Sequence, residues 1–151
     1  FATNSLEQLC INLANERLQS HFTRITFEAG KADALAEGVT VQASDYSSVD
    51  PTPTLDLLLA KSTGVLAMIV EECHIPKGSD ASLLEKLKDT HLKKSKRFDV
   101  PKDPKQRGLF IVHHYAGPVS YAVEGLLVKN RDPLPEDAVV VLAGSSTPLV
   151  A

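Results

Sequence analysis

The sequence NSLEQLCINLANERL at residues 4–18 decides the fold of this chain. Its apolar residues recur every three or four positions, which is the period of one face of an α-helix; they are Leu6, Leu9, Cys10, Leu13, Ala14 and Leu18. The same period continues towards Glu37, and Gly38 is a natural helix stop. Gly30 lies inside this stretch and costs about 1 kcal/mol relative to alanine. The sequence therefore predicts one long helix within residues 1–38.

The start of this helix carries capping signals. Asn4 or Ser5 can accept hydrogen bonds from the first backbone N–H groups of the helix. Glu7 or Gln8 stands where a capping box places its second acceptor. We therefore expect a capping box at this end of the helix.

A second helical pattern predicts a helix-loop-helix in the middle of the chain. Apolar residues recur with a helical period at 65–72 and again at 81–92. Ser79 or Asp80 is placed to cap the second of these helices. Residues 73–78 would then form the tip that joins the two helices.

A basic stretch and two β-like runs follow. Residues 93–107 contain two prolines and many charges, and they predict an exposed loop. Residues 109–115 and 119–123 are apolar and β-branched, which is typical of strands. They predict a β-hairpin with its turn at Gly117 or Pro118.

The remaining segments are shorter. Residues 44–54 predict a loop, and residues 55–61 predict a short helix. Residues 124–130 predict a short helix, which must end before Pro133. Residues 138–143 form an apolar helix or strand. Together the elements predict an α+β fold that is mainly helical, with a long helix, a helix-loop-helix and a small antiparallel β-hairpin.

The composition is that of an ordinary globular chain. Of its 151 residues, 43% are hydrophobic and 23% are charged, which excludes a disordered tail, a collagen and a disulfide-bonded mini-scaffold. No apolar run approaches the roughly 18 residues that cross a bilayer, and no secretory signal is recognisable. Cys10 and Cys73 lack a metal or redox spacing and are expected to be reduced thiols in the cytosol. Because the chain begins with Phe1, we expect it to be a piece of a longer protein.

Positive charge is concentrated in one part of the chain. The net charge is −3, yet the cluster between Lys86 and Arg107 holds nine basic and three acidic side chains and carries +6. The remainder therefore carries −9. The asymmetry fits an acidic partner that meets one patch, and it fits equally a solvated basic face without a partner. A basic nucleic-acid-binding domain is the alternative function, although Phe98 is the sole aromatic residue in the cluster and no nucleic-acid-binding motif accompanies it.

No residue pattern indicates catalysis or metal binding. His113 and His114 are adjacent on a predicted strand and therefore point to opposite faces, which favours packing over shared ligation of one ion. Cys73 and His74 are also adjacent in the sequence, and they are equally weak candidates for shared ligation of one ion. The sequence has no phosphate-binding loop of the GxxxxGK type and no recognisable Ser/His/Asp set. We therefore expect no catalytic residue, no metal site and no bound cofactor in this chain.

The tip of the helix-loop-helix is the most distinctive surface feature. Ile75 and Pro76 form an apolar pair at the turn, and Lys77 flanks them. Exposed apolar residues at a loop tip mark a contact with a partner. Ile75 could equally fold back onto its own two helices, and the residues alone leave both interpretations open.

Four segments stand out as motifs and follow one another along the chain, at residues 4–19, 64–87, 114–121 and 129–134. The first reads NSLEQLCINLANERLQ, the third HYAGPVSY and the fourth KNRDPL. In this order they resemble the relay helix, the actin-binding helix-loop-helix, the HYAGxVxY segment and the strut of the myosin motor domain. The resemblance extends over nearly the whole chain.

The resemblance implies a division of the chain into the parts of the lower fifty-kilodalton subdomain of such a motor. These parts are the relay helix (1–38), the relay loop and connector (39–63), the helix-loop-helix (64–92), a basic loop (93–108), the β-hairpin (109–123), and a helix, strut and final helix (124–151). It also implies that the phosphate loop and both switches lie upstream of Phe1. The fragment would then not hold nucleotide by itself.

The resemblance further assigns roles to individual residues. The residues implied to bind actin are His74, Ile75, Pro76, Lys77, Lys93, Lys94, Lys96 and Arg97. Those implied to couple the relay helix to the nucleotide site are Asn4, Ser5, Glu7, Gln8, Asn12, Asn15 and Glu16. The strut residues would be Asp132 and Pro133.

The implied partners are filamentous actin and the rest of the motor, namely the converter and the upper half of the cleft. No membrane and no nucleic acid is expected as a partner. The intact parent would be an actin-activated ATPase that uses Mg-ATP in the cytoplasm, at the actin cytoskeleton. Three departures from the family pattern suggest a divergent or unconventional class: His74 at the tip, Val41 where many members have Trp, and Gly30 within the relay helix.

Overall fold

The computed structural model describes residues 3–40, 50–131 and 136–144. Its helices are α1 (Leu6–Ala36), α2 (Thr52–Leu59), α3 (Val65–His74), α4 (Asp80–His91), α5 (Leu126–Arg131) and α6 (Glu136–Ala143), and η2 (Pro104–Gln106) is a 3-10 turn. Its strands are β1 (Phe98–Asp99), β2 (Leu109–His114) and β3 (Gly117–Ala122). The fold is mainly helical with one small antiparallel sheet, which confirms the predicted α+β class.

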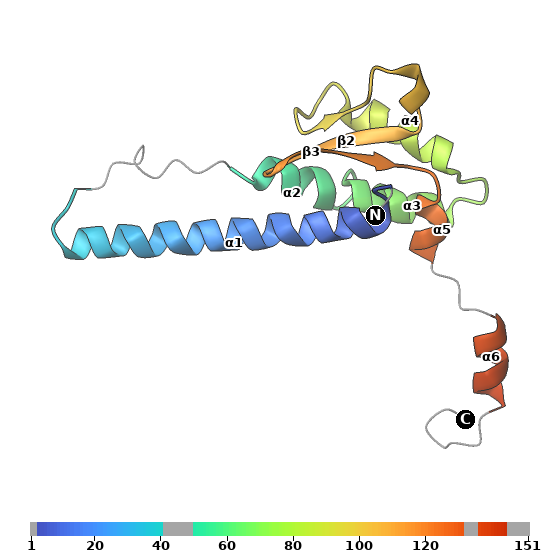
Figure 1. The fold of residues 1–151 in the computed structure, drawn as a ribbon, viewed down its shortest axis with the longest axis horizontal. Helices are drawn as coiled ribbons and strands as arrows, with labels where there is room; N and C mark the ends of the chain where they lie inside the picture. The colour runs from blue at the N-terminus through green and yellow to red at the C-terminus, as the bar shows by residue number, and fades with distance from the viewer. Residues whose placement is uncertain (1–2, 41–49, 132–135, 145–151) are drawn as a thin grey trace.

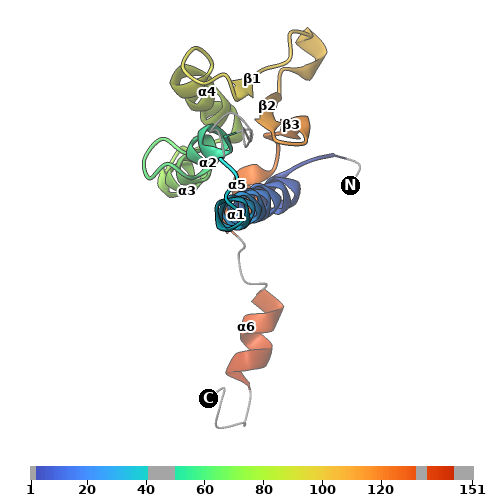
Figure 2. The ribbon, with the colours of Figure 1, turned by 90° about the vertical axis from the view of Figure 1, so that its left-hand side faces the viewer.

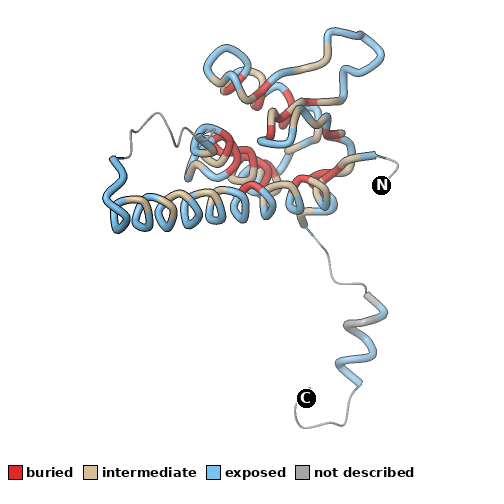
Figure 3. The backbone as a smooth tube through the Cα atoms, turned by 60° about the vertical axis from the view of Figure 1, so that its left-hand side comes forward, coloured by how far each residue is buried: buried red, intermediate tan, exposed pale blue. Residues whose placement is uncertain are grey.

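Helix α1 is much longer than the core that covers it. Helices α2 to α5 and the sheet gather over its N-terminal half, and its C-terminal half extends away from them (Figures 1 and 2). Of its 31 residues, only Leu9 and Glu16 are buried. Figure 3 shows the same division, with the buried segments collected over one end of the helix. The far half of α1 therefore contributes almost nothing to the core of this chain.

The core lies between helices α2 to α4 and the inner face of the sheet. Its largest fully buried apolar side chains are Leu9, Leu58, Ile69, Leu83, Leu87, Phe110, Tyr121 and Leu126. Three aromatic rings stack through the sheet, with centroids 5.9 Å apart for Phe98 and Phe110 and 5.4 Å apart for Phe110 and Tyr121. Burial of this apolar surface is the main force that holds the short elements together.

The β-hairpin forms as predicted, but its turn lies two residues earlier than expected. His114 pairs with Gly117, so Tyr115 and Ala116 make the turn. Gly117 has a φ of 131°, a conformation that residues with a Cβ rarely adopt. Pro118 sits in β3 opposite His113, and because β3 is an edge strand the missing N–H is tolerated there.

The basic stretch is only partly the exposed loop that the sequence predicts. Phe98 and Asp99 form strand β1, which pairs with Val112 and Ile111 of β2. The side chain of Phe98 is buried, and burying one aromatic ring is a sufficient reason for this segment to join the sheet. The hairpin is thus one part of a three-stranded sheet in the order β1-β2-β3.

The start of α2 also differs from the prediction. Helix α2 begins at Thr52, whereas a loop was expected up to residue 54; Pro53 is tolerated because it lies in the first turn, where its missing N–H is not needed. The Asp50 carboxylate accepts the Thr52 N–H at 2.9 Å and supports this start. Helix α1 runs unbroken through Gly30, as predicted. The apolar segment near the C-terminus is a helix, α6.

Candidate functional site: the helix-loop-helix tip and the anchored long helix

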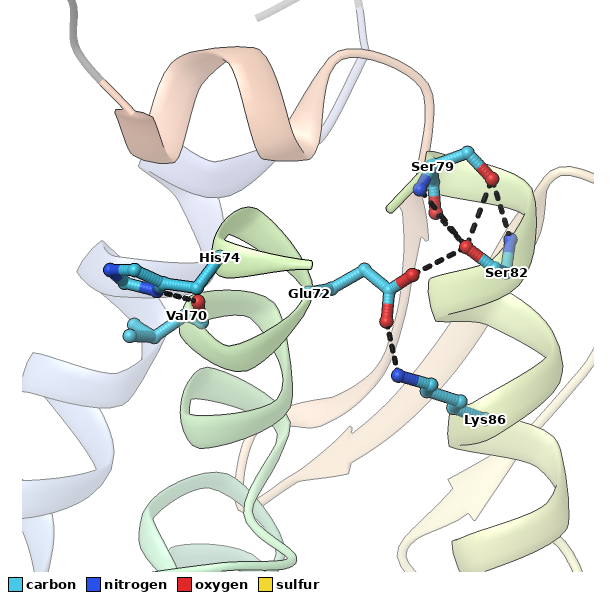
Figure 4. Close-up of polar contacts among 6 residues, drawn as sticks. All are labelled: Val70, Glu72, His74, Ser79, Ser82 and Lys86. Carbon is cyan, nitrogen blue, oxygen red and sulfur yellow. Dashed lines mark hydrogen bonds and ion pairs between the residues drawn. The ribbon is translucent and has the colours of Figure 1, made fainter. Parts of the chain in front are cut away.

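The helix-loop-helix is held together by a buried carboxylate. Glu72 of α3 is almost completely buried and points at α4 (Figure 4). It accepts hydrogen bonds from Ser82 Oγ and from Lys86 Nζ, each at 2.5 Å. Lys86 and then Ser82 hold the pKa of Glu72 below its usual value. The two helices are therefore fixed relative to each other by a hydrogen-bonded ion pair as well as by apolar packing.

The loop between the two helices is tight for a specific steric reason. Gly78 donates its N–H to Ile75 O at 2.9 Å, which closes the turn. A Cβ on Gly78 would lie 2.1 Å from the Glu72 carbonyl oxygen, so only glycine fits. Ser79 then caps α4, in a capping box with Ser82. The sequence predicted the turn and the cap but not this close approach.

Three of the four predicted residues at the tip are exposed. His74, Pro76 and Lys77 face solvent, whereas Ile75 is half-buried. Ile75 is therefore less exposed than the other three tip residues, and this intermediate exposure is compatible with both interpretations of the residue. His74 Nδ1 donates to Val70 O at 2.7 Å, so the ring lies along α3 (Figure 4).

The predicted basic contacts do not form one patch with the tip. The tip precedes α4 and the basic residues follow it, and a helix of 12 residues is about 18 Å long. Lys93, Lys94 and Lys96 are exposed. Arg97 is half-buried; it lines one pocket together with Lys94 and Lys96 and another together with Glu16 and Asp50.

Helix α1 begins against the outer edge of the sheet. The Asn4 side chain donates through Nδ2 to Ser120 O at 3.1 Å, and the backbone carbonyl oxygen of Asn4 accepts the Ala122 N–H at 2.9 Å. Ser5 is the N-cap residue but makes no side-chain capping hydrogen bond, so the predicted capping box is wrong. The Asn4 side chain, the other predicted cap, contacts β3 instead. Glu7 forms an ion pair with Lys129 of α5 at 2.9 Å.

A chain of hydrogen bonds joins the middle of this region to the hairpin. Gln8 Nε2 donates to Asn12 Oδ1 at 2.9 Å, and Asn12 Nδ2 donates to the Tyr121 hydroxyl at 2.6 Å. The Tyr121 hydroxyl lies 2.7 Å from His114 Nε2, and His114 Nδ1 lies 3.1 Å from Glu16 Oε1. Glu16 Oε1 also accepts the Tyr115 N–H at 2.7 Å. Asn12 and Glu16 of α1 thus each have a partner on the hairpin, and Gln8 contacts Asn12 along the helix.

The structure therefore brings three of the predicted coupling residues, Gln8, Asn12 and Glu16, to one face of α1, with Asn4 just before the helix. Asn4, Gln8, Asn12 and Glu16 are spaced four apart and all belong to contacts that lead to the hairpin. Asn15 is exposed and lies off this face. Sequence reasoning named these residues but missed their partners His114 and Tyr121; the spacing of four was the signal, because it puts polar side chains in one row on a helix.

Helix α5 is tied to the helix-loop-helix by contacts that the sequence did not predict. The Asp80 carboxylate accepts the N–H groups of Gly125 at 2.7 Å and Leu127 at 3.2 Å, so it serves the start of α5 rather than capping α4. Arg131 donates to Cys73 O at 3.2 Å, at the end of α3. The predicted strut residues Asp132 and Pro133, and also Val41, lie outside the described residues.

The described part of the chain contains neither a metal-binding cluster nor a helix suited to crossing a membrane. No group of three or more His, Cys, Asp or Glu side chains there is arranged to hold a metal ion. Within the same residues, no helix has both the length and the apolar character that a membrane crossing requires.

Comparison with known proteins identifies the family. The family model of the myosin head (motor domain) matches residues 1–151. The chain is 42% identical over 150 residues to Myosin-IIIb of Mus musculus, 40% identical over 150 residues to Myosin-IIIa of Mus musculus and 41% identical over 150 residues to Myosin-2 of Arabidopsis thaliana. Each match covers 99% of this chain but only 11%, 9% and 12% of those relatives, respectively. The chain belongs to the myosin motor-domain family and spans about a tenth of the length of these curated relatives.

Proposed function

We propose that this chain is the actin-filament-binding portion of a myosin motor that couples ATP hydrolysis to movement along actin. Mg-ATP would be bound by other parts of the whole protein, which would act at the actin cytoskeleton. The observation that carries the proposal is the exposed tip at Pro76 and Lys77, which projects from two helices locked by Glu72. Membership of the myosin motor-domain family supports it.

The tip has the properties of a recognition loop. Pro76 restricts its backbone and the hydrogen bond from the Gly78 N–H to Ile75 O closes the turn, so less conformational entropy is lost when it binds. An apolar residue beside a lysine gives an apolar centre with a charged rim, as protein interfaces have. The exposed Lys93, Lys94 and Lys96 at the other end of α4 would add a second, electrostatic contact with an acidic filament surface.

Helix α1 is suited to the role of the relay helix. Its first half is fixed to the sheet and to α5 through Asn12, Glu16 and Glu7. Its second half carries large apolar side chains in the open, with Phe22 66% and Leu35 57% exposed. We infer that these side chains are covered by the rest of the motor, such as the converter, and that α1 carries movement between the two regions.

The segment after α5 is assigned the role of the strut, at Asp132 and Pro133. The support for this proposal is the attachment of α5: Asp80 and Arg131 tie it to the helix-loop-helix, and Lys129 ties it to α1. A strut that leaves α5 would therefore connect both functional regions to the other half of the cleft.

The experiment that tests actin binding is cosedimentation of the full-length motor with filamentous actin. Lys77→Glu is expected to weaken binding several-fold, by roughly 1 kcal/mol, and more at low salt than at high salt. Lys31→Glu is the matched control, because it makes the same charge change at an exposed position on the far half of α1. Equal affinities for the two variants would contradict the assignment of the tip.

The nucleic-acid alternative gains no support from the family match. Retention of the full-length motor on nucleic acid at physiological salt, measured beside actin cosedimentation, separates the two functions. We expect retention by actin alone.

A further inference from the structure

A cavity of about 300 Å³ lies beside the polar chain, between α1, the start of α2 and the turn that joins β2 to β3. The residues that matter for its chemistry are Glu16, Thr23, Phe27, Asp50, Arg97 and Tyr115. Its volume is at the lower end of the range for small-molecule sites, which is enough for one aromatic ring with a polar group. Nothing in the proposed motor function uses this cavity.

Glu16, one of the residues that line this cavity, has a side-chain oxygen without a partner in the described part of the chain. Glu16 is completely buried, and its Oε1 serves both His114 and Tyr115. Its Oε2 is buried and makes no hydrogen bond to any described residue. Buried carboxylate oxygens are rarely left without a donor, because an unsatisfied one is costly. A ligand that brings an N–H group to Oε2 would remove this cost.

The charges around the cavity favour a cation. Asp50 lies on the wall together with Glu16, and Arg97 is the one basic residue among the described residues that line it. The hydrogen bonds from Thr52, with a smaller contribution from Arg97, lower the pKa of Asp50, so this carboxylate is ionised at neutral pH. Two carboxylates and one guanidinium leave an excess of one negative charge.

The remaining walls suit an aromatic body. Phe27, Pro51 and Tyr115 supply apolar and aromatic surface. Ser20 and Thr23 supply hydroxyl groups on the α1 side. Most small-molecule sites have this composition, with an apolar lining and a few convergent polar groups.

We propose that this cavity binds a small organic cation of the aromatic amidinium or ammonium class. Its N–H group donates to Glu16 Oε2, and its ring lies against Pro51 and Tyr115. Because the walls come from α1 and from the hairpin turn, a bound ligand braces the long helix against the sheet. Ligands of this class would therefore modulate any movement of α1 relative to the hairpin.

The test uses the full-length protein that contains this chain and para-fluorobenzamidine as the probe, observed by fluorine NMR. We expect saturable binding with a Kd on the order of 1 mM, as befits a ligand of this size. Para-fluorobenzoate, which has the same shape and the opposite charge, should not bind. Glu16→Gln keeps the shape of the side chain and should weaken benzamidine binding about tenfold.

A pair of matched variants locates the site. Thr23→Phe fills the cavity without touching the hydrogen bonds of Glu16, and it should abolish binding. Thr26→Phe makes the same change at an exposed position of α1 that does not line the cavity, and it should leave binding unchanged. Melting temperatures of both variants confirm that they are folded. Benzamidine binding that survives Thr23→Phe, binding of benzoate at equal strength, or no saturable binding at all would each overturn the proposal.

Discussion

Glu16 of α1 and His114 of β2 meet in the core with Oε1 3.1 Å from Nδ1, although 98 positions separate them in the sequence. Burial keeps the pKa of His114 below its ordinary value of 6.5, in spite of the neighbouring Glu16. The ring is therefore neutral at pH 7, and it donates through Nδ1 to Glu16 and accepts the Tyr121 O–H through Nε2. The protonation of this one pair therefore determines which atom donates and which accepts in each hydrogen bond from Tyr121 through Asn12 to Gln8.

We expect the free energy of unfolding to fall as the pH drops below about 6.5. A histidine whose pKa is lowered in the folded state binds protons less readily there than in the unfolded chain, so acid favours unfolding. Burial lowers the pKa of both His114 and His91, and both contribute with the same sign. Urea denaturation at a series of pH values measures the slope. His114→Gln should make the slope shallower, and His114→Gln with His91→Gln shallower still; an unchanged slope in the double variant would contradict this explanation.

Replacing Glu16 should be much more damaging than replacing the residue beside it. Glu16→Ala leaves the Tyr115 N–H and the His114 Nδ1–H without an acceptor and should cost about 1–3 kcal/mol of unfolding free energy. Glu16→Gln keeps an acceptor oxygen and should cost less. Asn15→Ala is the control, since an exposed helical substitution usually changes stability by less than about 0.5 kcal/mol. Similar losses for Glu16→Ala and Asn15→Ala would show that the hairpin contact contributes little.

The proposed coupling role of Asn15 has a separate test. Because Asn15→Ala should leave the fold intact, its effect on the actin-activated ATPase rate of the whole motor reports coupling rather than folding. We expect a lower rate. A normal rate would remove Asn15 from the coupling residues.

Gly78→Ala should disturb the tip even though it adds one methyl group. The new Cβ would lie 2.1 Å from the Glu72 carbonyl oxygen, so the loop must move. We expect weaker actin binding in cosedimentation together with a lower melting temperature. Gly108→Ala is the matched control, because a Cβ there meets nothing within 4 Å. If the two alanine variants bind actin equally well, the conformation of the tip is not what actin recognises.

Charge reversal at the two ends of α4 should have independent effects. Lys77 precedes the helix and Lys94 follows it, about 18 Å away along α4. Substitutions that far apart without shared partners are normally additive. The fold-loss in actin affinity for Lys77→Glu with Lys94→Glu should therefore equal the product of the two single losses. The Lys94→Glu loss should appear mainly in the association rate, measured by stopped flow at low salt.

The sequence by itself determined the elements whose formation depends on neighbours along the chain. The apolar period of residues 6–36 was sufficient for α1, including its passage through Gly30. The helix-loop-helix and the β-hairpin could also be predicted from the sequence, because the Ser79 cap and the hairpin turn depend on residues only a few positions away. The four motifs also carried the family, which the comparison confirmed.

Only the tertiary structure decided which side chains meet across the fold. Glu16 lies in a helix of ordinary pattern, and its burial depends on His114 and Tyr115 arriving from the hairpin. Asp80 was a predicted cap of α4, but its carboxylate accepts a backbone N–H at the start of α5. Phe98 was predicted to lie in a loop, but it forms part of strand β1. Local propensity acts through the backbone over a few residues, whereas a buried polar group is satisfied by whichever partner the packing brings within 3 Å or so. Which polar side chains become partners is therefore determined by the packing of the whole apolar core, and it cannot be predicted from any short stretch of sequence.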